Sequence, residues 1–191
     1  MDIYSRKIVG REIYATESAE QAAEVLRKAR FVETLPLNHD LVLHSDNGSP
    51  MKGAAMFATM QKMGIVPFFS RPSVNNDNPY SESLFKTLKY IPAYPAQPFK
   101  TIAAARRWVA TFSTWYNHSH RHSGLKFVTP AQKHKGRDKT ILKQRKCVYQ
   151  KARKLHPERW TGKTRNWDHV AEVELNPNNE HALNIEMKKA A

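Results

Sequence analysis

Two acidic side chains in this sequence stand where carboxylates could hold a metal ion. Asp46 follows the short apolar run Leu41–Leu43, which predicts a strand buried on both sides. Glu82 stands near the start of a predicted helix, Tyr80–Tyr90, and 35 residues lie between it and Asp46. Open α/β sheets place their ligands at the carboxyl ends of strands, which is where Asp46 is expected. The pair is therefore a candidate site for a divalent cation and for chemistry on a phosphate.

Two lysines extend this candidate site along the predicted helix. Glu82, Lys86 and Lys89 stand at positions i, i+4 and i+7, so they share one helical face. A carboxylate beside two ammonium groups could hold a cation while the lysines bind phosphate. A simpler interpretation also fits, in which Asp46 caps a turn and Glu82 forms a solvated ion pair with Lys86. Spacing alone favours the simpler interpretation.

Alternating strands and helices are predicted to position these residues. A capping box, Ser18 followed three residues later by Gln21, begins the first helix, and Gly64 ends the second. The first strand is a bent strand or a pair of strands. In chain order, the predicted elements are strand Ile3–Tyr14, helix 18–30, strand Leu41–Leu43, helix 50–63, strand Ile65–Phe69 and helix Tyr80–Tyr90. This alternation is typical of an α/β domain.

The second half of the chain is predicted to be mainly helical. A connector with three prolines, residues 91–100, precedes a helix over Ile102–Tyr116. A histidine-rich loop, Asn117–Pro130, leads to a strongly basic helix over Lys139–His156. The remaining residues are looser, and Val170–Leu175 predicts a short strand. The three histidines of the loop, at 118, 120 and 122, could bind a metal, but no cysteine or nearby carboxylate completes the set, which disfavours a zinc site.

The positive charge of the chain is concentrated in one stretch. The 191 residues contain 31 Lys and Arg against 17 Asp and Glu, a net charge of +14. Residues 101–165 alone hold 17 basic and 2 acidic side chains, a net charge of +15. Such a block attracts polyanions, most often nucleic acid, and the alternative is a surface that is merely basic and soluble. On the basic helix, Lys143 and Lys146 are candidate contacts to DNA phosphates.

The composition excludes several classes of protein. A single cysteine, Cys147, rules out a disulfide framework and a cysteine-ligated zinc site, and it fits a reducing cytoplasm. No apolar run approaches the ~20 residues of a membrane span, and the first residues lack an apolar signal region. We therefore expect a soluble cytoplasmic protein with no membrane partner.

Several sequence motifs together resemble one known family. The resemblance covers roughly residues 2–135 and continues more weakly to about Pro177. The matching segments include Asp2-Ile3-Tyr4-Ser5-Arg6-Lys7, His44-Ser45-Asp46-Asn47-Gly48-Ser49-Pro50, Asn76-Asp77-Asn78-Pro79-Tyr80-Ser81-Glu82-Ser83-Leu84-Phe85, Trp115-Tyr116-Asn117 and Thr129-Pro130-Ala131-Gln132. They resemble the catalytic core of bacterial insertion-sequence transposases, the group whose core is similar to that of retroviral integrases.

The resemblance implies a fold and an active site. The fold would be RNase H-like, a mixed sheet with flanking helices, followed by a basic and mainly helical C-terminal tail. An Asp-Asp-Glu site would bind two Mg²⁺ or Mn²⁺ ions. Asp46 matches the family's second aspartate and Glu82 its glutamate, which makes both the expected catalytic and metal-binding residues. Lys89 matches a basic residue that contacts element-end DNA, and Lys86 shares its helical face.

The resemblance also implies that one catalytic residue is missing. The family's first aspartate lies on a central first strand upstream of the segment that matches Asp2–Gly10, so we expect that strand to be absent here. We interpret Asp2 as a polar residue at a strand end. A two-carboxylate site predicts impaired metal binding and little or no strand transfer. The missing central strand leaves unpaired strand edges, which predicts a marginally stable chain.

Three functions remain open on the sequence. The first is DNA transposition and integration, with phosphodiester hydrolysis and strand transfer at element ends, this chain being a partial or inactive fragment. The second is a non-catalytic DNA-binding remnant that interferes with intact transposase, and the third is an RNase H-like nuclease. We expect residues 1–135 to form the incomplete core and residues 136–191 a basic DNA-binding tail. The expected partners are transposon ends, target DNA, and further copies of the chain or full-length transposase, in a bacterial cytoplasm near the nucleoid.

Overall fold

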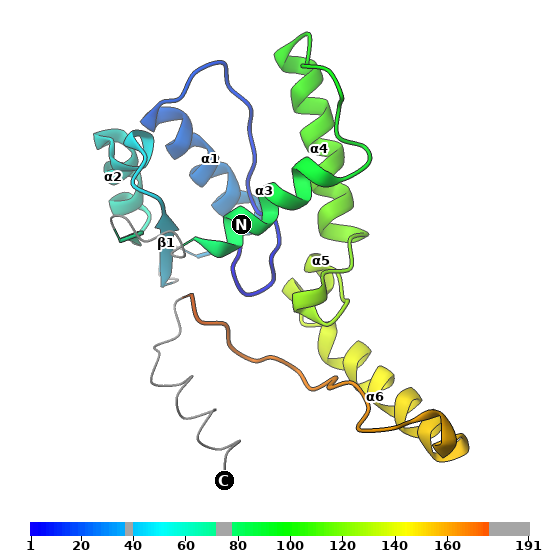
Figure 1. Cartoon of the computed structure of the whole chain (residues 1–191). Helices are drawn as coiled ribbons and strands as arrows, with labels where there is room; N and C mark the ends of the chain where they lie inside the picture. The colour runs from blue at the N-terminus through cyan, green and yellow to red at the C-terminus, as the bar shows by residue number, and fades with distance from the viewer. Residues whose placement is uncertain (37–39, 72–77, 176–191) are drawn as a thin grey trace. The chain divides into compact units, whose positions relative to one another are not determined.

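The structure of the chain, a computed structural model, describes residues 1–36, 40–71 and 78–175 (Figure 1). The chain divides into two compact units. Unit 1 comprises Met1–Ile13 and Pro95–Ala171, and unit 2 comprises Tyr14–Tyr94 and Glu172–Ala191. The predicted functional boundary between residues 135 and 136 falls inside unit 1 and stays a prediction. None of the helices described is both long and apolar enough to cross a membrane.

Unit 2 has the alternating helices and strands that the sequence predicts. Its elements are α1 (Ala19–Val32), β1 (Leu41–Ser45), η1 (Ser49–Lys52), α2 (Ala54–Lys62), β2 (Ile65–Phe69) and α3 (Pro79–Tyr90). Ser18 caps α1, and its Oγ accepts a hydrogen bond from the Gln21 backbone N–H at 3.2 Å. Gly64, with φ at +62°, follows the end of α2 as predicted.

One predicted helix of unit 2 is interrupted. The sequence predicts a continuous helix from Pro50 to Gly64, but the backbone is extended at Gly53, which separates the 3₁₀ helix η1 from α2. A side chain at residue 53 would collide with Ala19 of α1. The close approach of the chain to α1 therefore requires glycine here, and it sets where α2 begins.

The sheet of unit 2 is a parallel pair with one covered face. β1 pairs with β2 in a register that runs from Leu41 opposite Ile65 to Ser45 opposite Phe69. The apolar core beneath it contains Ala23 of α1, three methionines of the α2 region and Ile65, with Leu41 and Leu43 packed against them. Val42 is 66% exposed and Val66 is 60% exposed, so the prediction that this strand is buried on both sides is wrong. The reason is that α1 and α2 cover one face, and no described element covers the other.

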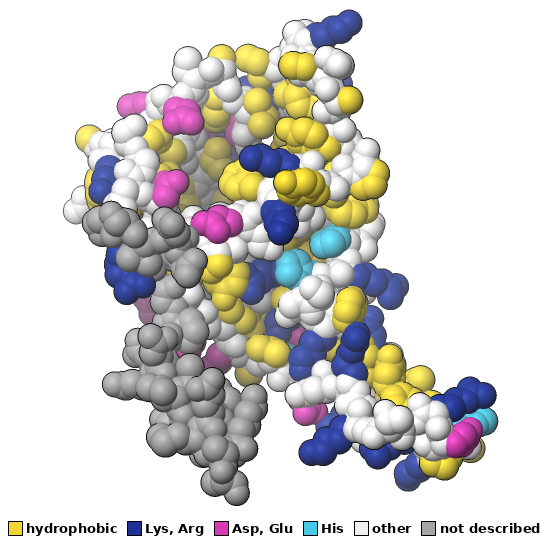
Figure 2. All heavy atoms as spheres, in the orientation of Figure 1, with side chains coloured by type: hydrophobic (Ala, Val, Ile, Leu, Met, Phe, Trp, Pro, Cys, Tyr) yellow, Lys and Arg dark blue, Asp and Glu magenta, His cyan; other side chains and the backbone are white. Residues whose placement is uncertain are grey.

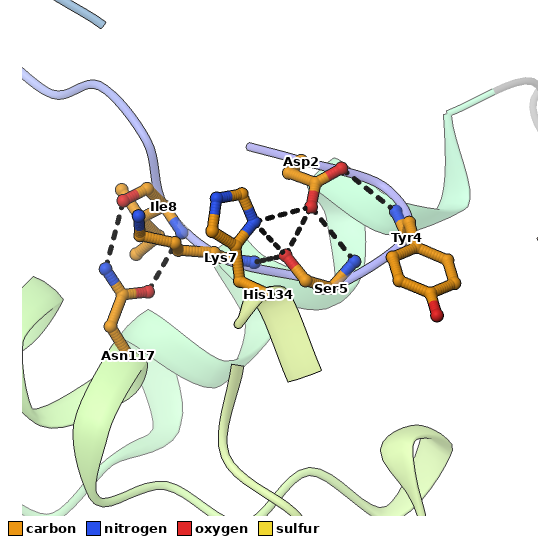
Figure 3. A network of polar contacts seen from close by, with 7 residues as sticks. All are labelled: Asp2, Tyr4, Ser5, Lys7, Ile8, Asn117 and His134. Atoms are coloured by element: carbon orange, nitrogen blue, oxygen red, sulfur yellow. Dashed lines mark hydrogen bonds and ion pairs between the residues drawn. The ribbon is translucent and has the colours of Figure 1, made fainter. Parts of the chain in front are cut away.

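The predicted strand Ile3–Tyr14 does not form. The Ile8 backbone N–H donates to Asn117 Oδ1 at 2.9 Å, and Asn117 Nδ2 donates to the Ile8 carbonyl at 3.0 Å (Figure 3). A side chain of α4 (Ile102–His118) thus supplies the hydrogen bonds that a neighbouring strand would have made. Among the described residues the sheet is purely parallel and two-stranded, where we expected a mixed sheet.

Unit 1 is built on helices, as predicted. After α4 come η2 (Ser123–Leu125), α5 (Pro130–His134), α6 (Asp138–Leu155) and η3 (Pro157–Arg159). A capping box begins α5, with Thr129 Oγ1 accepting from the Gln132 N–H and Gln132 Oε1 accepting from the Thr129 N–H. A core cluster of Leu125, Val128, Leu142 and Trp167 joins the loop after α4, helix α6 and the segment after α6.

The segment after α6 lacks the predicted strand over Val170–Leu175. Residues 160–175 have no helix or strand (Figure 1). Lysine side chains hold the segment instead: Lys133 Nζ donates to the Val170 carbonyl at 2.6 Å, and Lys126 Nζ donates to the Asp168 carbonyl. Because lysines occupy these backbone acceptors, the segment is fixed without a partner strand.

The start of the chain is anchored by polar contacts in unit 1. The Asp2 carboxylate accepts hydrogen bonds from the backbone N–H groups of Tyr4 and Ser5 at 3.2 Å, and it lies 3.1 Å from His134 Nδ1 (Figure 3). Burial acts to raise the pKa of Asp2, but hydrogen bonds from Ser5 and His134 outweigh it, so the pKa lies below its ordinary value. Asp2 therefore stabilises a turn and not the end of a strand.

Candidate functional site

Asp46 lies directly after β1, at the carboxyl end of the parallel pair. Its Oδ1 accepts a hydrogen bond from the Gly48 backbone N–H at 3.1 Å, which closes the turn that Asn-Gly predicts. The side chain of Asn47 donates to the carbonyl of Ser70, just beyond β2, at 2.8 Å. These bonds join the ends of the two strands and fix the position of Asp46, whose side chain is exposed.

Glu82 lies in the first turn of α3, in the same unit. Its backbone N–H donates to the Asn78 carbonyl at 3.3 Å, and its side chain is exposed. Lys86 and Lys89 are also exposed and follow Glu82 at i+4 and i+7, so the three share one face as predicted. No ion pair joins Glu82 to Lys86 among the described residues, so the solvated pair of the simpler interpretation is not formed.

The chemistry of Asp46 and Glu82 fits a hard divalent cation. Carboxylate oxygens are ligands that Mg²⁺ and Mn²⁺ prefer, and neither carboxylate forms an ion pair with another described residue. The described part of the chain contains no group of three or more His, Cys, Asp or Glu side chains that could hold a metal by itself. Asp46 and Glu82 as metal ligands therefore stay a prediction, and they would form an incomplete set.

The residues between the strand β2 and α3 are only partly described. The motif that precedes Glu82 includes residues 72–77, which lie outside the described residues. Asn78, Pro79 and Tyr80 begin the described part again, and Tyr80 Oη donates to the Glu174 carbonyl at 2.9 Å. Helix α3 buries none of its own side chains, and Phe85 is 57% exposed.

The two lysines predicted on the basic helix differ in their surroundings. Lys143 is exposed, and no described side chain pairs with it. Lys146 Nζ lies 2.6 Å from Asp168 Oδ1, and this hydrogen bond and charge lower the pKa of Asp168. Figure 2 shows Lys and Arg side chains gathered over α6 and the segment that follows it. Lys143 is thus the better placed of the two for a phosphate contact, and both contacts stay predictions.

The histidine-rich loop is a structural turn. His122 Nδ1 accepts a hydrogen bond from the Gly124 N–H at 3.1 Å, and its backbone pairs with Val128 in an isolated bridge. Burial lowers the pKa of His120, and burial followed by the charge of Arg6 lowers that of His122. Both rings are therefore held in the neutral form near pH 7. The His120 ring packs against Trp115 and Tyr116 of α4, and the His122 ring packs edge-on against His120.

The structure adds a basic and aromatic cleft that sequence reasoning missed. The cleft, with a volume of about 370 Å³, is lined by Arg121, Phe127, Arg145, Tyr149, Arg165 and Trp167. All six residues belong to unit 1. Only one signal in the sequence pointed to part of it, namely Arg145 and Tyr149 at i and i+4 on a predicted helix. The other four come from two loops that only tertiary structure brings together.

Comparison with known proteins finds an integrase core domain and insertion-sequence transposases. Residues 63–130, which include Glu82, match the family described as Integrase core domain. The transposase for insertion sequence element IS904 of Lactococcus lactis subsp. lactis is 31% identical over 134 residues, which cover 68% of this chain and 51% of that protein. A putative transposase for IS986/IS6110 of Mycobacterium tuberculosis is 22% identical over 134 residues, covering 69% of this chain and 48% of that protein. The chain thus spans about half the length of the curated relatives that it matches.

Proposed function

The chain belongs to the insertion-sequence transposases with an integrase-like core, and we propose that it carries part of their metal-dependent site for cutting and joining DNA. The observation that carries this proposal is the position of Asp46 at the carboxyl end of β1, 35 residues before an exposed Glu82 on α3. Both lie in unit 2, and residue 82 falls within the matched integrase core.

In the proposed mechanism the residues of unit 2 bind and orient. Asp46 and Glu82 supply carboxylate oxygens to Mg²⁺ or Mn²⁺, and the hydrogen bond from Gly48 holds Asp46 in place. When bound, a pair of such ions supplies charge neutralisation at a phosphodiester and a more acidic water. Lys86 and Lys89 bind neighbouring phosphates of the element end, since their ammonium groups share the face of Glu82. Water would serve as the nucleophile for nicking, and a DNA 3′-hydroxyl for strand joining.

We propose that the chain by itself binds metal weakly and transfers strands poorly. Two carboxylates give fewer ligands than the three of an Asp-Asp-Glu site, and the described residues offer no third beside them. The chain would then need a carboxylate from elsewhere in a longer protein or from a partner copy. Without it, the chain acts as a DNA-binding subunit, held on DNA by the basic surface of α6 and able to join mixed oligomers with intact transposase.

Nicking of a supercoiled plasmid separates these functions. The purified chain is incubated, in the presence of Mg²⁺ or Mn²⁺, with plasmid DNA that carries its own gene with flanking sequence. Any nicking by the chain should vanish in Asp46→Asn and in Glu82→Gln. The control Asp40→Asn removes an exposed carboxylate six residues before Asp46 and should leave nicking unchanged.

The outcomes distinguish three hypotheses about the function of the chain. Nicking that survives both substitutions contradicts the assignment of Asp46 and Glu82. Salt-sensitive DNA binding without nicking, equal in wild type and both variants, supports the DNA-binding subunit. Cleavage of an RNA–DNA hybrid in place of the plasmid supports an RNase H-like nuclease and contradicts the transposase proposal.

A further inference from the structure

The cleft of unit 1 combines planar surfaces with positive charge. The guanidinium of Arg165 lies over the Phe127 ring at 5.0 Å and over the Trp167 ring at 5.7 Å. Arg145 lies over the Trp167 ring at 5.3 Å, and Tyr149 contacts that ring edge-on at 5.2 Å. The stacked guanidinium and aromatic groups provide the surfaces on which unpaired bases stack in single-strand binding proteins.

This arrangement is held in place by the fold. Arg145 donates hydrogen bonds to the carbonyls of Lys126 and Phe127 at 2.7 and 3.1 Å, which join α6 to the loop that presents Phe127. Trp167 is 5% exposed and packs in the core cluster with Leu125, Val128 and Leu142. The floor of the cleft is therefore rigid, while the side chains of Arg121, Phe127 and Arg165 are exposed at its rim.

The cleft has unbalanced positive charge. No acidic residue lines it, and neither Arg121 nor Arg165 forms an ion pair with any residue that the structure describes. The nearby acid in the sequence, Asp168, pairs with Lys146. Two guanidinium groups without a counter-charge can bind phosphate oxygens in a bidentate manner.

One buried polar group of a residue that lines the cleft has no hydrogen-bond partner. Trp167 Nε1 is buried and makes no hydrogen bond within the described residues. Buried N–H groups without a partner are rare, because each one costs free energy.

We propose that this cleft binds an unpaired nucleotide of a DNA strand. Its base would stack on the surface formed by Phe127 and Arg165, and its phosphates would lie against the two guanidinium groups without a counter-charge, those of Arg121 and Arg165. The volume of about 370 Å³ is within the range of ~300–1,000 Å³ that is typical of small-molecule sites. The proposal rests on the proposed function only for the choice of DNA as the polyanion. It means that unit 1 binds single-stranded DNA in addition to duplex DNA.

Binding of short strands with and without bases tests the proposal. The full chain is titrated, in EDTA, into a fluorescein-labelled strand of eight thymidine nucleotides and into an equally long strand of abasic units, with anisotropy as the readout. The abasic strand has the same charge but nothing to stack. We expect the thymidine strand to bind about 5- to 150-fold more tightly, the range for one stacked base.

Three variants locate the effect. Phe127→Leu keeps an apolar side chain without a ring, and Arg165→Lys keeps the charge without the plane, so each should bring the ratio of the two affinities close to one. Arg153→Lys changes an exposed arginine of α6 outside the cleft and should leave the ratio unchanged. Circular dichroism verifies that every variant keeps the helical content of wild type.

Other results of these titrations would overturn the proposal. Equal affinity for both strands, or a ratio that persists in Phe127→Leu and Arg165→Lys, overturns the proposal. Displacement of the strand by free thymidine monophosphate at an equal concentration of nucleotide identifies a mononucleotide site and also overturns it. The titration contains no metal, so the two proposals can fail separately. Nicking that survives both Asp46→Asn and Glu82→Gln contradicts the site proposed in unit 2 and leaves this inference standing. Equal affinity for both strands, in a chain whose nicking is lost in those two variants, refutes this inference alone.

Discussion

Not every basic residue in the charged stretch faces solvent. Lys133 is 4% exposed, and its Nζ lies 3.2 Å from Asp138 Oδ2, which is itself 1% exposed. His169 Nε2 lies 3.2 Å from the same oxygen, and the Lys133 ammonium lies 4.1 Å above the ring of Tyr4. This buried ionic cluster holds parts of unit 1 together. The charge of residues 101–165 therefore overstates what is available to DNA.

Removing one member of the ionic cluster should be costly. Lys133→Met leaves the buried Asp138 carboxylate without its ammonium partner, which should lower the free energy of unfolding by about 3–5 kcal/mol. The double variant Lys133→Met/Asp138→Leu should recover most of that loss, since no charge stays unpaired. Urea denaturation followed by circular dichroism measures both. The control Lys143→Met, at an exposed position of α6, should change the value by less than ~0.5 kcal/mol.

Stability should fall as the pH drops below 6.5. Burial, the charge of Arg6 and then His120 lower the pKa of His122 from its ordinary value of 6.5. The contribution of neutral His122 to the free energy of unfolding is fully present above pH 6.5. It is lost as the pH falls through the lowered pKa of His122 in the folded chain, because the unfolded chain takes up the proton first.

Denaturation at several pH values between 7.5 and 5 checks this titration. His122→Asn keeps an acceptor for the Gly124 N–H but cannot titrate, so it should flatten the decline. The slope for one proton cannot exceed about 1.4 kcal/mol per pH unit, and the partial exposure of the ring reduces it further. The control His118→Asn, at an exposed position, should leave the decline in stability with falling pH unchanged. If His122→Asn also left the decline unchanged, the assignment of the titration to His122 would be contradicted.

At the level of elements, the signals carried by neighbouring residues were the ones that predicted structure correctly. The cap at Ser18 and the glycine at the end of α2 act within a few residues, and α1 begins and α2 ends where expected. Helix α4 also forms over the predicted residues. The candidate site was predicted from short motifs around Asp46 and Glu82 that resemble a known family, and its assignment stays a prediction.

The elements that sequence reasoning placed wrongly are those that depend on a distant partner. Ile3–Tyr14 and Val170–Leu175 have the composition of strands, but a strand needs a second strand to bond with. Here an asparagine side chain of α4 and a lysine side chain of α5 bond with these segments. The cleft of unit 1 was missed for the same reason, because Arg121, Phe127 and Arg165 meet only in three dimensions.

The junction between η1 and α2 should tolerate no side chain. Gly53→Ala places a methyl group against Ala19 of α1, and overpacking of this kind costs about 1–3 kcal/mol. Gly162→Ala is a matched control, because a Cβ at residue 162 has no described atom within 4 Å. Thermal melting should show a lower midpoint for Gly53→Ala alone. Equal midpoints for the two variants would mean that α1 moves aside without cost.

On the scale of the whole molecule, charge and candidate chemistry belong to different units. Unit 2 carries Asp46, Glu82 and the lysines of α3, whereas unit 1 carries the basic helix and the arginine cleft. Under the proposed function, unit 1 would hold DNA by its phosphates and unit 2 would present carboxylates to the strand. This division also implies that DNA affinity and metal-dependent activity can be changed separately.

The salt dependence of duplex binding should report this division. Lys143→Ala should reduce the slope of log K against log salt by about 0.9, as expected for one lost phosphate contact. Lys146→Ala/Asp168→Ala removes a mutually paired cation and anion, so the slope should stay the same. Asp46→Asn, in unit 2, should also leave the slope of log K against log salt unchanged. A slope reduced equally by the first two variants would show that Lys146 contacts DNA in spite of its pairing with Asp168.

The anchoring of the first residues has a consequence for how the chain folds during synthesis. Asp2 contacts His134, Ile8 contacts Asn117 and Tyr4 contacts His169, partners 109 to 165 residues further along. At ~5–20 residues per second, the ribosome exposes these partners roughly 5 to 35 seconds after the segment that they hold. Residues 14–94, which have their own core, can fold in that interval. Residues 2–8 are therefore the part of unit 1 that must wait longest for its native contacts.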